Sequence, residues 1–550
     1  MNRESRTSTY NNPPPPNTPA GEAVPARNET AARRSLISST LLVMVATLLS
    51  RILGVGREIV FANHFGTTAE AGAYRAAFRV PDTLYLLIVG GALGSSLIPV
   101  FSRFLGQNDQ EKAWRLANTV VNYAMMVLVA CSALAWLLTP VIVQTILAPG
   151  FDPASQQLTI ELTRTLLLQP FFMGLGGIAL ALLNGSERFF WPALAPLIYN
   201  FSIIAGIIFL SGPFGIQGVA IGVVIGAALY LLVQLPALIR LGFYWRPVLD
   251  SEAPGAKQVL VALGPRLMGQ AAFQANFFVA TNLGSGLVDG TSRVAAFENA
   301  YQLFMLPHGI FAISLATVAF PAMARLYGQN DMVGMKHTLT SSLRQVLFFA
   351  LPAALGLGIL ARPIVQTLLQ SGQFNTESTE LVSQTLFCFS FGLVSYGVVE
   401  IVTRAFYALH DTRTPVTVAL VTVALNLVLS MILIHPLQQG GLALALAFST
   451  TLEMILLTWL LRRRIGPFEL NDSGSLILAI FKIAVAADIM GAVLLLALRL
   501  LEGPLENGGK LVTLVLTILL VGLGGAVYAG AAYLLKLDEL RSALRRFIRR

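Results

Sequence analysis

Apolar segments long enough to cross a lipid bilayer recur along almost the entire chain. A helix needs about 20 apolar residues to span the hydrocarbon core, and such segments follow one another from residue 36 to residue 535. Of the 550 residues, 55% are hydrophobic and 12% are charged, a balance that soluble domains do not have. The sequence therefore predicts an all-α polytopic membrane protein with about 14 transmembrane helices. The predicted spans are residues 36–61, 76–102, 117–147, 158–184, 190–211, 215–240, 258–284, 295–324, 340–369, 378–408, 414–434, 439–461, 475–501 and 510–535.

The chain also repeats itself at an offset of 222 residues. The sequence Gly-Gln-Asn-Asp occupies residues 106–109 and 328–331, and Val-Gln-Thr occupies residues 143–145 and 365–367. Each repeat contains six predicted spans, an even number, so both copies have the same orientation in the membrane. Parallel repeats of this kind form two lobes with a substrate site at their interface. A duplication retained only for packing remains an alternative.

Charged connections assign the two sides of the membrane. Lys and Arg cluster in alternate connections, at residues 103–115, 240–257 and 462–464, whereas the intervening turns contain almost none. The positive-inside rule then predicts that both termini are cytoplasmic. Cytoplasmic loops also explain the net charge of +9, so no nucleic-acid partner is expected. The predicted organisation is a disordered cytoplasmic leader (1–35), an N-terminal lobe (36–241), a cytoplasmic linker (242–257), a C-terminal lobe (258–464), a further pair of helices (465–536) and a basic cytoplasmic tail (537–550).

The first predicted span carries charges that a simple membrane anchor would not have. Arg51, Arg57 and Glu58 lie in its second half. An isolated arginine in a bilayer costs several kcal/mol, so such residues face a watery cavity or a bound anion. The six-residue spacing separates the arginines by about 9 Å along the helix and roughly 120° around it. Both can therefore border one wide cavity. Structural pairing of Arg57 with Glu58 or Glu70 remains an alternative.

The sequence offers no signature of an enzyme. It contains no nucleotide-binding loop, no His/Cys metal cluster and no nucleophile motif. Its two cysteines, Cys131 and Cys388, both lie in apolar segments, which indicates neither a disulfide framework nor a thiolate metal site. We therefore expect no catalytic residues, no cofactor and no metal.

Several motifs, in order, resemble one transporter family. Ser50-Arg51-Ile52-Leu53-Gly54 is followed by Arg57, and Phe78-Arg79-Val80-Pro81 lies near the start of the second span. Further matching stretches are residues 189–200, 309–321 and 404–415. Together they resemble the MurJ (MviN) lipid II flippases, members of the multidrug, oligosaccharidyl-lipid and polysaccharide exporter superfamily. The resemblance covers about residues 36 to 535 and includes the pattern of twelve spans plus two.

The resemblance implies a function and a site. Such a flippase moves undecaprenyl-diphosphate-linked disaccharide-pentapeptide, called lipid II, from the inner to the outer leaflet of the bacterial plasma membrane by alternating access. Its partners would be lipid II and membrane lipids, with cell-wall synthesis proteins as further candidates, and its last two helices would form a groove for the lipid tail. Arginine suits diphosphate because its planar fork binds two phosphate oxygens. The resemblance implies Arg51 and Arg57 for the diphosphate, and Ser50, Arg79 and Arg293 are further candidates from their places near them or near span entrances. Glu58, Glu298 and Glu400 are candidate cavity or coupling acids because they are charges within spans, and pairing of Glu298 and Glu400 with an arginine across the lobe interface remains the alternative.

Two positions depart from the family pattern. Tyr85 and Gln302 stand where many relatives have arginines, so the predicted cavity is less cationic than theirs. Arg75, Arg79 and Arg293 are candidates for replacement charges, although each lies near a span boundary where arginines also snorkel to the interface. Three alternatives therefore remain: an exporter of another lipid-linked oligosaccharide, an exporter of drugs, and an inactive scaffold for envelope assembly.

Overall fold

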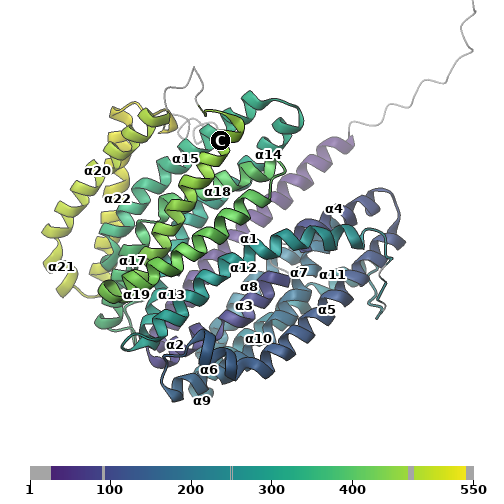
Figure 1. Ribbon diagram of the computed structural model, residues 1–550, viewed down its shortest axis with the longest axis horizontal. Coiled ribbons are helices and arrows are strands. Elements are labelled where there is room, and N and C mark those ends of the chain that lie inside the picture. Colours follow the sequence, from purple (N-terminus) through teal and green to yellow (C-terminus); the bar gives the residue numbers. More distant parts are fainter. Residues whose placement is uncertain (1–26, 89–92, 248, 251, 469–475, 541–550) are drawn as a thin grey trace, which may run out of the picture.

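The computed structural model describes residues 27–88, 93–247, 249–250, 252–468 and 476–540, and these residues form helices and turns without a strand. Figure 1 shows two groups of helices side by side, the first lobe in purple to blue and the second in teal to green. The first lobe contains α1 (Arg27–Phe65), α2 (Ala69–Ala77), α3 (Arg79–Ile88), α4 (Leu93–Gly106), α5 (Gln110–Val141), α6 (Pro153–Leu166), α7 (Gln169–Gly185), α8 (Phe190–Ala205), α9 (Ser211–Phe214), α10 (Ile216–Leu232) and α11 (Leu235–Arg240).

The second lobe is built in the same order. It contains α12 (Ala256–Ser285), α13 (Gly290–His308), α14 (Ser314–Gly328), α15 (Met332–Ile359), α16 (Ala361–Leu369), α17 (Thr376–Ser390), α18 (Leu393–Ala408) and α19 (Arg413–Ile465). Three π-helical turns, η1 (Ile142–Leu147), η2 (Gly206–Leu210) and η3 (Gly309–Ile313), extend or join these helices. In the part of the chain that is described, nine helices are long and apolar enough to cross a membrane, and the bent pair α17 and α18 adds a tenth. The predicted all-helical membrane fold is confirmed, while the exact number of crossings stays a prediction.

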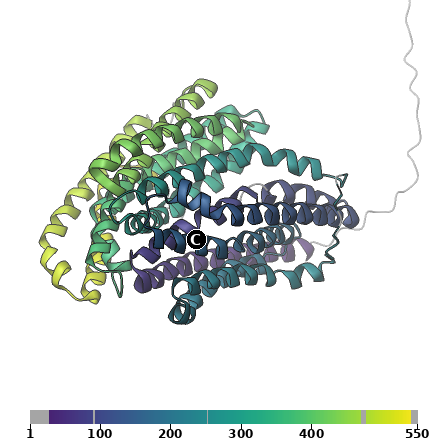
Figure 2. The ribbon, with the colours of Figure 1, turned by 60° about the horizontal axis from the view of Figure 1, so that its bottom comes forward.

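The remaining helices, α20 (Leu476–Leu500), α21 (Glu502–Asn507) and α22 (Lys510–Leu534), pack on the second lobe. Both ribbon views place them, in yellow, on the side of that lobe away from the first (Figures 1 and 2). The hydroxyls of Thr367 in α16 and Thr517 in α22 are 2.8 Å apart. Tyr528 in α22 donates to the Phe348 carbonyl at 2.7 Å. These contacts attach this group of helices to the second lobe. Among the described residues, the group takes no part in the interface between the two lobes.

Local geometry repeats along with the sequence. Asn108 and Asn330 both adopt a left-handed conformation, with φ of 57° and 59°, which asparagine tolerates better than most residues. Asp109 then caps α5 by accepting from the Lys112 amide at 3.1 Å, and Asp331 caps α15 by accepting from the Gly334 amide at 2.8 Å. The two lobes therefore start equivalent helices with equivalent turns.

Helix α19 consists of two arms that fold back on each other. Gln438 interrupts it with φ 52° and ψ −129°, close to the φ 56° and ψ −142° of Gly215 between α9 and α10. Arg464 near the end of α19 pairs with Asp411 just before its start, which requires the two ends to meet. The arms correspond to the predicted spans 414–434 and 439–461.

The predicted leader needs a correction. Helix α1 begins at Arg27, so the expectation of disorder is wrong for residues 27–35. Ala31, Ala32, Arg33 and Arg34 are strong helix formers, and helix α1 includes them. The rest of the predicted leader, residues 1–26, and most of the predicted basic tail, residues 541–550, lie outside the described residues.

The lobes meet through polar contacts where α1 ends, which we call the closed end. The Asn63 side chain donates to the Ser371 hydroxyl at 2.8 Å, and the Asn63 carbonyl accepts from the Gln373 amide at 2.9 Å. The hydroxyls of Thr67 and Ser378 are 2.8 Å apart. The Gly150 amide donates to the Ser285 hydroxyl at 3.1 Å. Gly372 packs against Asn63 as Gly150 packs against Ser285. Positions 63 and 285, like 150 and 372, are one repeat offset apart, so each lobe contributes the same two surfaces to the closed end.

Candidate functional site: a cavity of paired charges between the lobes

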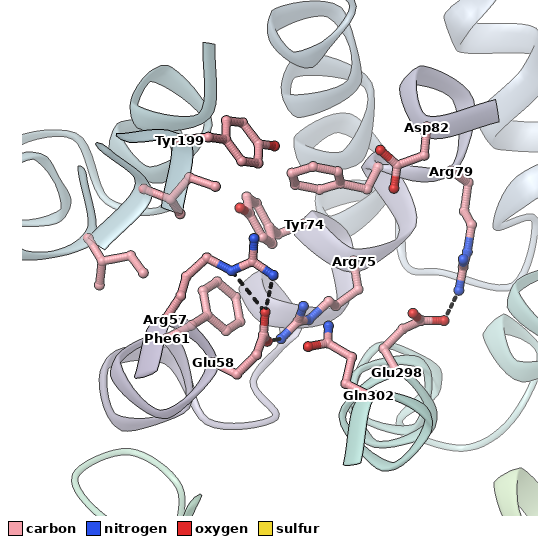
Figure 3. Close-up of a pocket in the computed structure, with 13 residues that line it drawn as sticks. Arg57, Glu58, Phe61, Tyr74, Arg75, Arg79, Asp82, Tyr199, Glu298 and Gln302 are labelled. Atoms are coloured by element: carbon pink, nitrogen blue, oxygen red, sulfur yellow. Dashed lines mark hydrogen bonds and ion pairs between the residues drawn. The ribbon is translucent and has the colours of Figure 1, made fainter. Parts of the chain in front are cut away.

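A cavity of about 180 Å³ lies between the two lobes, deep to the closed end. Helices α1, α2, α3 and α8 with η2 supply its walls from the first lobe, and α13 supplies the wall from the second. Figure 3 shows charged and aromatic side chains from these elements pointing toward one another. The cavity is lined by Arg57, Glu58, Phe61, Tyr74, Arg75, Phe78, Arg79, Asp82, Tyr199, Ile203, Ile207, Glu298 and Gln302. We call it the central cavity.

Glu58 is shared by two arginines in this cavity. Its Oε1 accepts from Arg57 Nη2 at 2.7 Å, and its Oε2 accepts from Arg75 Nη2 at 2.5 Å, as the dashed lines in Figure 3 show. Arg57 also donates to Asn200 at 3.3 Å, and Arg75 donates to Asn299 of the second lobe at 2.9 Å. The predicted alternative of an Arg57–Glu58 pair is therefore observed, and it forms part of a network that joins the lobes.

Gln302 occupies the position where the family pattern predicts an arginine. In the amide orientation that satisfies its neighbours, it donates to both Glu58 oxygens at 3.0 Å and accepts from Arg75 Nη1 at 2.8 Å. The neutral Gln302 amide thus bridges Glu58 and Arg75, which already form an ion pair with each other. Tyr85, at the other departing position, does not line this cavity and packs against the core of the first lobe.

Arg79 points to the second lobe and forms a separate ion pair. Its guanidinium pairs with Glu298 of α13, and its Nε donates to the Thr281 hydroxyl at 3.2 Å. The guanidinium carbon also lies 4.7 Å from the centre of the Phe277 ring, a cation–π contact. Arg79 is thus held by three groups of the second lobe.

The charges that line the central cavity balance in number. Three are arginines, Arg57, Arg75 and Arg79, and three are carboxylates, Glu58, Glu298 and Asp82. An incoming anion therefore has to displace a carboxylate from a guanidinium before it can bind to it. Arg75 Nε is buried and has no acceptor among the described residues.

Arg51 lies one step away along α1. It lines a second cavity of about 170 Å³, the connecting cavity, which also contains Arg57, Glu58 and Gln302. No ion pair of Arg51 occurs within the described chain. Ser50 beside it accepts a long hydrogen bond of 3.5 Å from Asn200. The structure therefore brings Ser50, Arg51, Arg57, Glu58, Arg79 and Glu298 into one region.

Two predicted residues lie elsewhere. Arg293, near the start of α13, donates to the Val288 carbonyl at 2.7 Å and to Gln439 at 2.5 Å, and it lines neither cavity. Glu400 pairs with Arg404 one turn along α18 at 2.7 Å. Both predictions relied on charge within or near a span, which does not indicate the direction of a side chain.

Sequence reasoning missed several members of the network. Asp82, Tyr199, Asn200 and Asn299 line or support the cavity, but the sequence pattern does not predict them as site residues, and it indicates Arg75 only as a replacement charge. Asn200 lies within one of the family motifs, so that motif offered a signal. Asn299 directly follows the predicted acid Glu298, but no sequence signal marks Asn299 itself.

The chain matches the family model described as lipid II flippase MurJ over residues 61–516. The chain belongs to the lipid II flippase MurJ family. Relatives in this family include the probable lipid II flippase MurJ of Rhizobium meliloti (strain 1021), 31% identical over 91% of this chain and 94% of that protein. The probable lipid II flippase MurJ of Vibrio cholerae (strain ATCC 39315 / El Tor Inaba N16961) is 29% identical over 94% of this chain and 99% of that protein.

Solved structures agree with this family. A lipid II flippase MurJ in an inward closed conformation superposes with a TM-score of 0.75 at 25% identity, covering 90% of this chain and 99% of that one. A multidrug resistance transporter of the MATE family in an inward-facing conformation superposes with a TM-score of 0.64 at 16% identity, covering 77% of this chain and 96% of that one. The second likeness concerns the fold alone. The family resemblance read from the motifs is confirmed.

Proposed function

We propose that this chain is a lipid II flippase, which moves undecaprenyl-diphosphate-linked peptidoglycan precursor from the inner to the outer leaflet by alternating access. The observation that carries the proposal is Glu58, which binds Arg57 and Arg75 at once in a cavity between two lobes. Two guanidiniums that converge on one carboxylate are spaced to converge on a diphosphate instead. Membership of the flippase family supports the same substrate.

The mechanism follows from exchange of anions. The diphosphate replaces Glu58 on Arg57 and Arg75, and each guanidinium offers a fork of donors for phosphate oxygens. Arg51 supplies a charge with no carboxylate partner in the described chain. The prenyl tail stays in the membrane and needs no polar path. We place Ser50 and Arg79 beside the diphosphate, and we leave Arg293 and Glu400 out because neither lines the cavities.

The size of the cavity requires a conformational change. Pockets that bury a drug-sized ligand have volumes of about 300–1,000 Å³, whereas the central cavity measures about 180 Å³. A disaccharide-pentapeptide therefore needs the lobes to separate. We infer that both termini are cytoplasmic, that the closed end faces the outer side of a bacterial plasma membrane, and that rocking of the lobes opens it. The moving contact is then the one that the end of α1 and Thr67 make with residues 371–378, together with the one that the end of α12 makes with Gly150.

Transport without catalysis completes the proposal. The arginines bind diphosphate in both leaflets and break no bond, so no catalytic residue, cofactor or metal is assigned. Lipid II and membrane lipids are the proposed partners. Contact with cell-wall synthesis proteins stays a prediction.

The test is translocation of lipid II by the purified chain in vesicles, together with rescue of a bacterial strain depleted of its own lipid II flippase. We expect the wild type to be active in both assays and Arg57→Ala and Arg75→Ala to lose at least about tenfold in rate, since each removes a charge-assisted contact of roughly 1.5–3 kcal/mol. Arg240→Ala, outside the cavities, serves as the control. A wild type that is abundant in the membrane but moves no lipid II would refute the proposal.

A further inference from the structure

A further cavity lies away from the central cavity. It measures about 660 Å³ and lies between the first half of α1 and the helices α7 and α8 of the same lobe. Its walls are mainly apolar, with Val43, Met44, Leu180 and Phe189 among them. Ser50 and Arg51 line it at the end nearest Arg57 on α1. We call it the α1–α8 pocket.

Arg51 connects this pocket to the central cavity. It lines both the α1–α8 pocket and the connecting cavity. The connecting cavity in turn shares Arg57, Glu58 and Gln302 with the central cavity. Three cavities therefore follow one another along α1, with an arginine at each junction.

The chemistry of the pocket fits an amphiphile with an anionic head. Arg51, a cation without a carboxylate partner among the described residues, stands at one end, and the mainly apolar pocket extends from it over about two turns of α1 to Val43. A phosphate on Arg51 would neutralise a charge that is otherwise costly inside a membrane protein. An isoprenoid or alkyl chain in the pocket would gain about 25 cal/mol for each Å² of apolar surface removed from water.

We propose that the α1–α8 pocket is a loading site for a prenyl diphosphate: Arg51 receives the diphosphate and the pocket holds the first isoprene units before the head group moves on to Arg57 and Arg75. The inference rests on the proposed function, which supplies the prenyl diphosphate, and deepens it by naming the position occupied before the central cavity. Six residues of helix separate Arg51 from Arg57, so the head group advances about 9 Å along α1.

The experiment compares two probes on the full chain in lipid nanodiscs. Farnesyl diphosphate carries head and tail, and inorganic diphosphate carries the head alone. We expect farnesyl diphosphate to bind at least about tenfold more tightly, because only it buries apolar surface. Met44→Trp and Ala193→Trp fill the pocket and should lower farnesyl diphosphate affinity about tenfold while leaving inorganic diphosphate binding unchanged. Two pocket-filling variants are compared because a local folding defect at one position would not explain a loss of affinity in both.

Val45→Trp is the matched control, because Val45 is an exposed neighbour of Met44 that does not line the pocket. It should bind both probes like the wild type. If both filled variants bind farnesyl diphosphate like the wild type, the loading site is refuted.

Translocation of lipid II in vesicles, measured on the same proteins, separates this inference from the proposed function. A wild type that moves lipid II while the filled variants bind and transport normally overturns the loading site alone. If the wild type moves no lipid II but the filled variants lose farnesyl diphosphate binding, the proposed function is overturned. The pocket is then supported as a prenyl diphosphate site.

Discussion

Glu58 determines how the arginines of the central cavity meet an anion. It contacts Arg57 and Arg75 with separate oxygens and accepts from Gln302 as well. Breaking a buried pair by removing one partner leaves the other charge uncompensated. Any anion that enters therefore competes with this carboxylate, and the carboxylate can expel the anion when it returns.

Replacing Glu58 by glutamine should strengthen anion binding and slow transport. In Glu58→Gln the two guanidiniums lose their shared carboxylate, so we expect inorganic diphosphate to bind about tenfold more tightly. Lipid II translocation should fall, because nothing displaces the bound head group. Titration calorimetry and the vesicle assay measure the two effects. Glu70→Gln, an exposed acid outside the cavities, should change neither; unchanged diphosphate affinity in Glu58→Gln would contradict the exchange of anions.

Gly309 of the opposite lobe leaves the space that the Arg51 guanidinium occupies. A Cβ built at residue 309 would lie 2.5 Å from Arg51 Nη1, so Gly309→Ala must push the guanidinium aside. We expect lipid II translocation to drop about tenfold, although alanine favours a helix over glycine by about 1 kcal/mol. Gly56→Ala, where a Cβ meets nothing within 4 Å, is the control. Equal activity of both variants would show that Arg51 needs no fixed position.

The arginines of α1 and the pairing of Arg57 with Glu58 could be predicted from sequence, but the second arginine on Glu58 and the contacts with the other lobe could not. Arg51 and Arg57 stand out because charge inside an apolar segment is rare. Arg75 lies in the short helix α2, and its partner Asn299 comes from the other repeat. Contacts between residues so far apart in sequence depend on how the lobes pack, which periodicity does not reveal. Arg293 shows the converse, since a charge near a span boundary bound Gln439 instead of the cavity.

At the scale of single elements, the two arms of α19 meet at a strained residue. Gln438 has a backbone conformation that glycine adopts at the equivalent position 215. A residue with a Cβ is held there at a cost of about 1–3 kcal/mol. Packing of the surrounding helices must offset that strain energy. A glycine at residue 438 would therefore remove backbone strain from the turn between the arms.

Gln438→Gly should stabilise the protein. We expect the free energy of unfolding to rise by about 1 kcal/mol, because relief of strain exceeds the entropy that glycine adds to the unfolded chain. Thermal unfolding of the detergent-purified protein measures the change. Gly215→Ala should lower stability at the corresponding turn. A lower melting temperature for Gln438→Gly would show that its side chain, not its backbone, matters at this turn.

The membrane spans could be predicted from the sequence, but the π-helical turns that interrupt them could not. Apolar length located α5, α10, α20 and α22, because the bilayer fixes how many residues a crossing needs. The π-helical turns leave no hydropathy signal, since they change only which backbone groups pair. One of these turns, η3, begins after His308 and places Gly309 next to the Arg51 guanidinium. A π-helical turn that the sequence does not reveal therefore helps to form the site.

For the whole molecule, the closed end is the contact that transport must break. Thr67 and Ser378 belong to different lobes, and their hydroxyls are 2.8 Å apart. The double variant Thr67→Cys/Ser378→Cys, made with Cys131→Ala and Cys388→Ala, should form a disulfide on oxidation, since neighbouring hydroxyls place Cβ atoms within its reach. We expect oxidation to stop lipid II translocation almost completely and reduction to restore it.

The control is a crosslink at the same spacing within one rigid unit. Thr367 and Thr517 also have hydroxyls 2.8 Å apart, but they join α22 to its own lobe. Thr367→Cys/Thr517→Cys should tolerate oxidation with little loss of transport. Full activity of the oxidised Thr67/Ser378 variant would mean that the closed end does not open during transport.

The equal numbers of arginines and carboxylates in the central cavity also bear on the electrical side of transport. With all six groups ionised, that part of the empty carrier moves no net charge when the lobes rock. The loaded carrier carries the diphosphate, and each elementary charge that crosses the field exchanges about 2.3 kcal/mol per 100 mV. A potential negative inside would therefore drive the loaded step outward, whereas the six charges of the central cavity would add almost no voltage dependence to the return of the empty carrier.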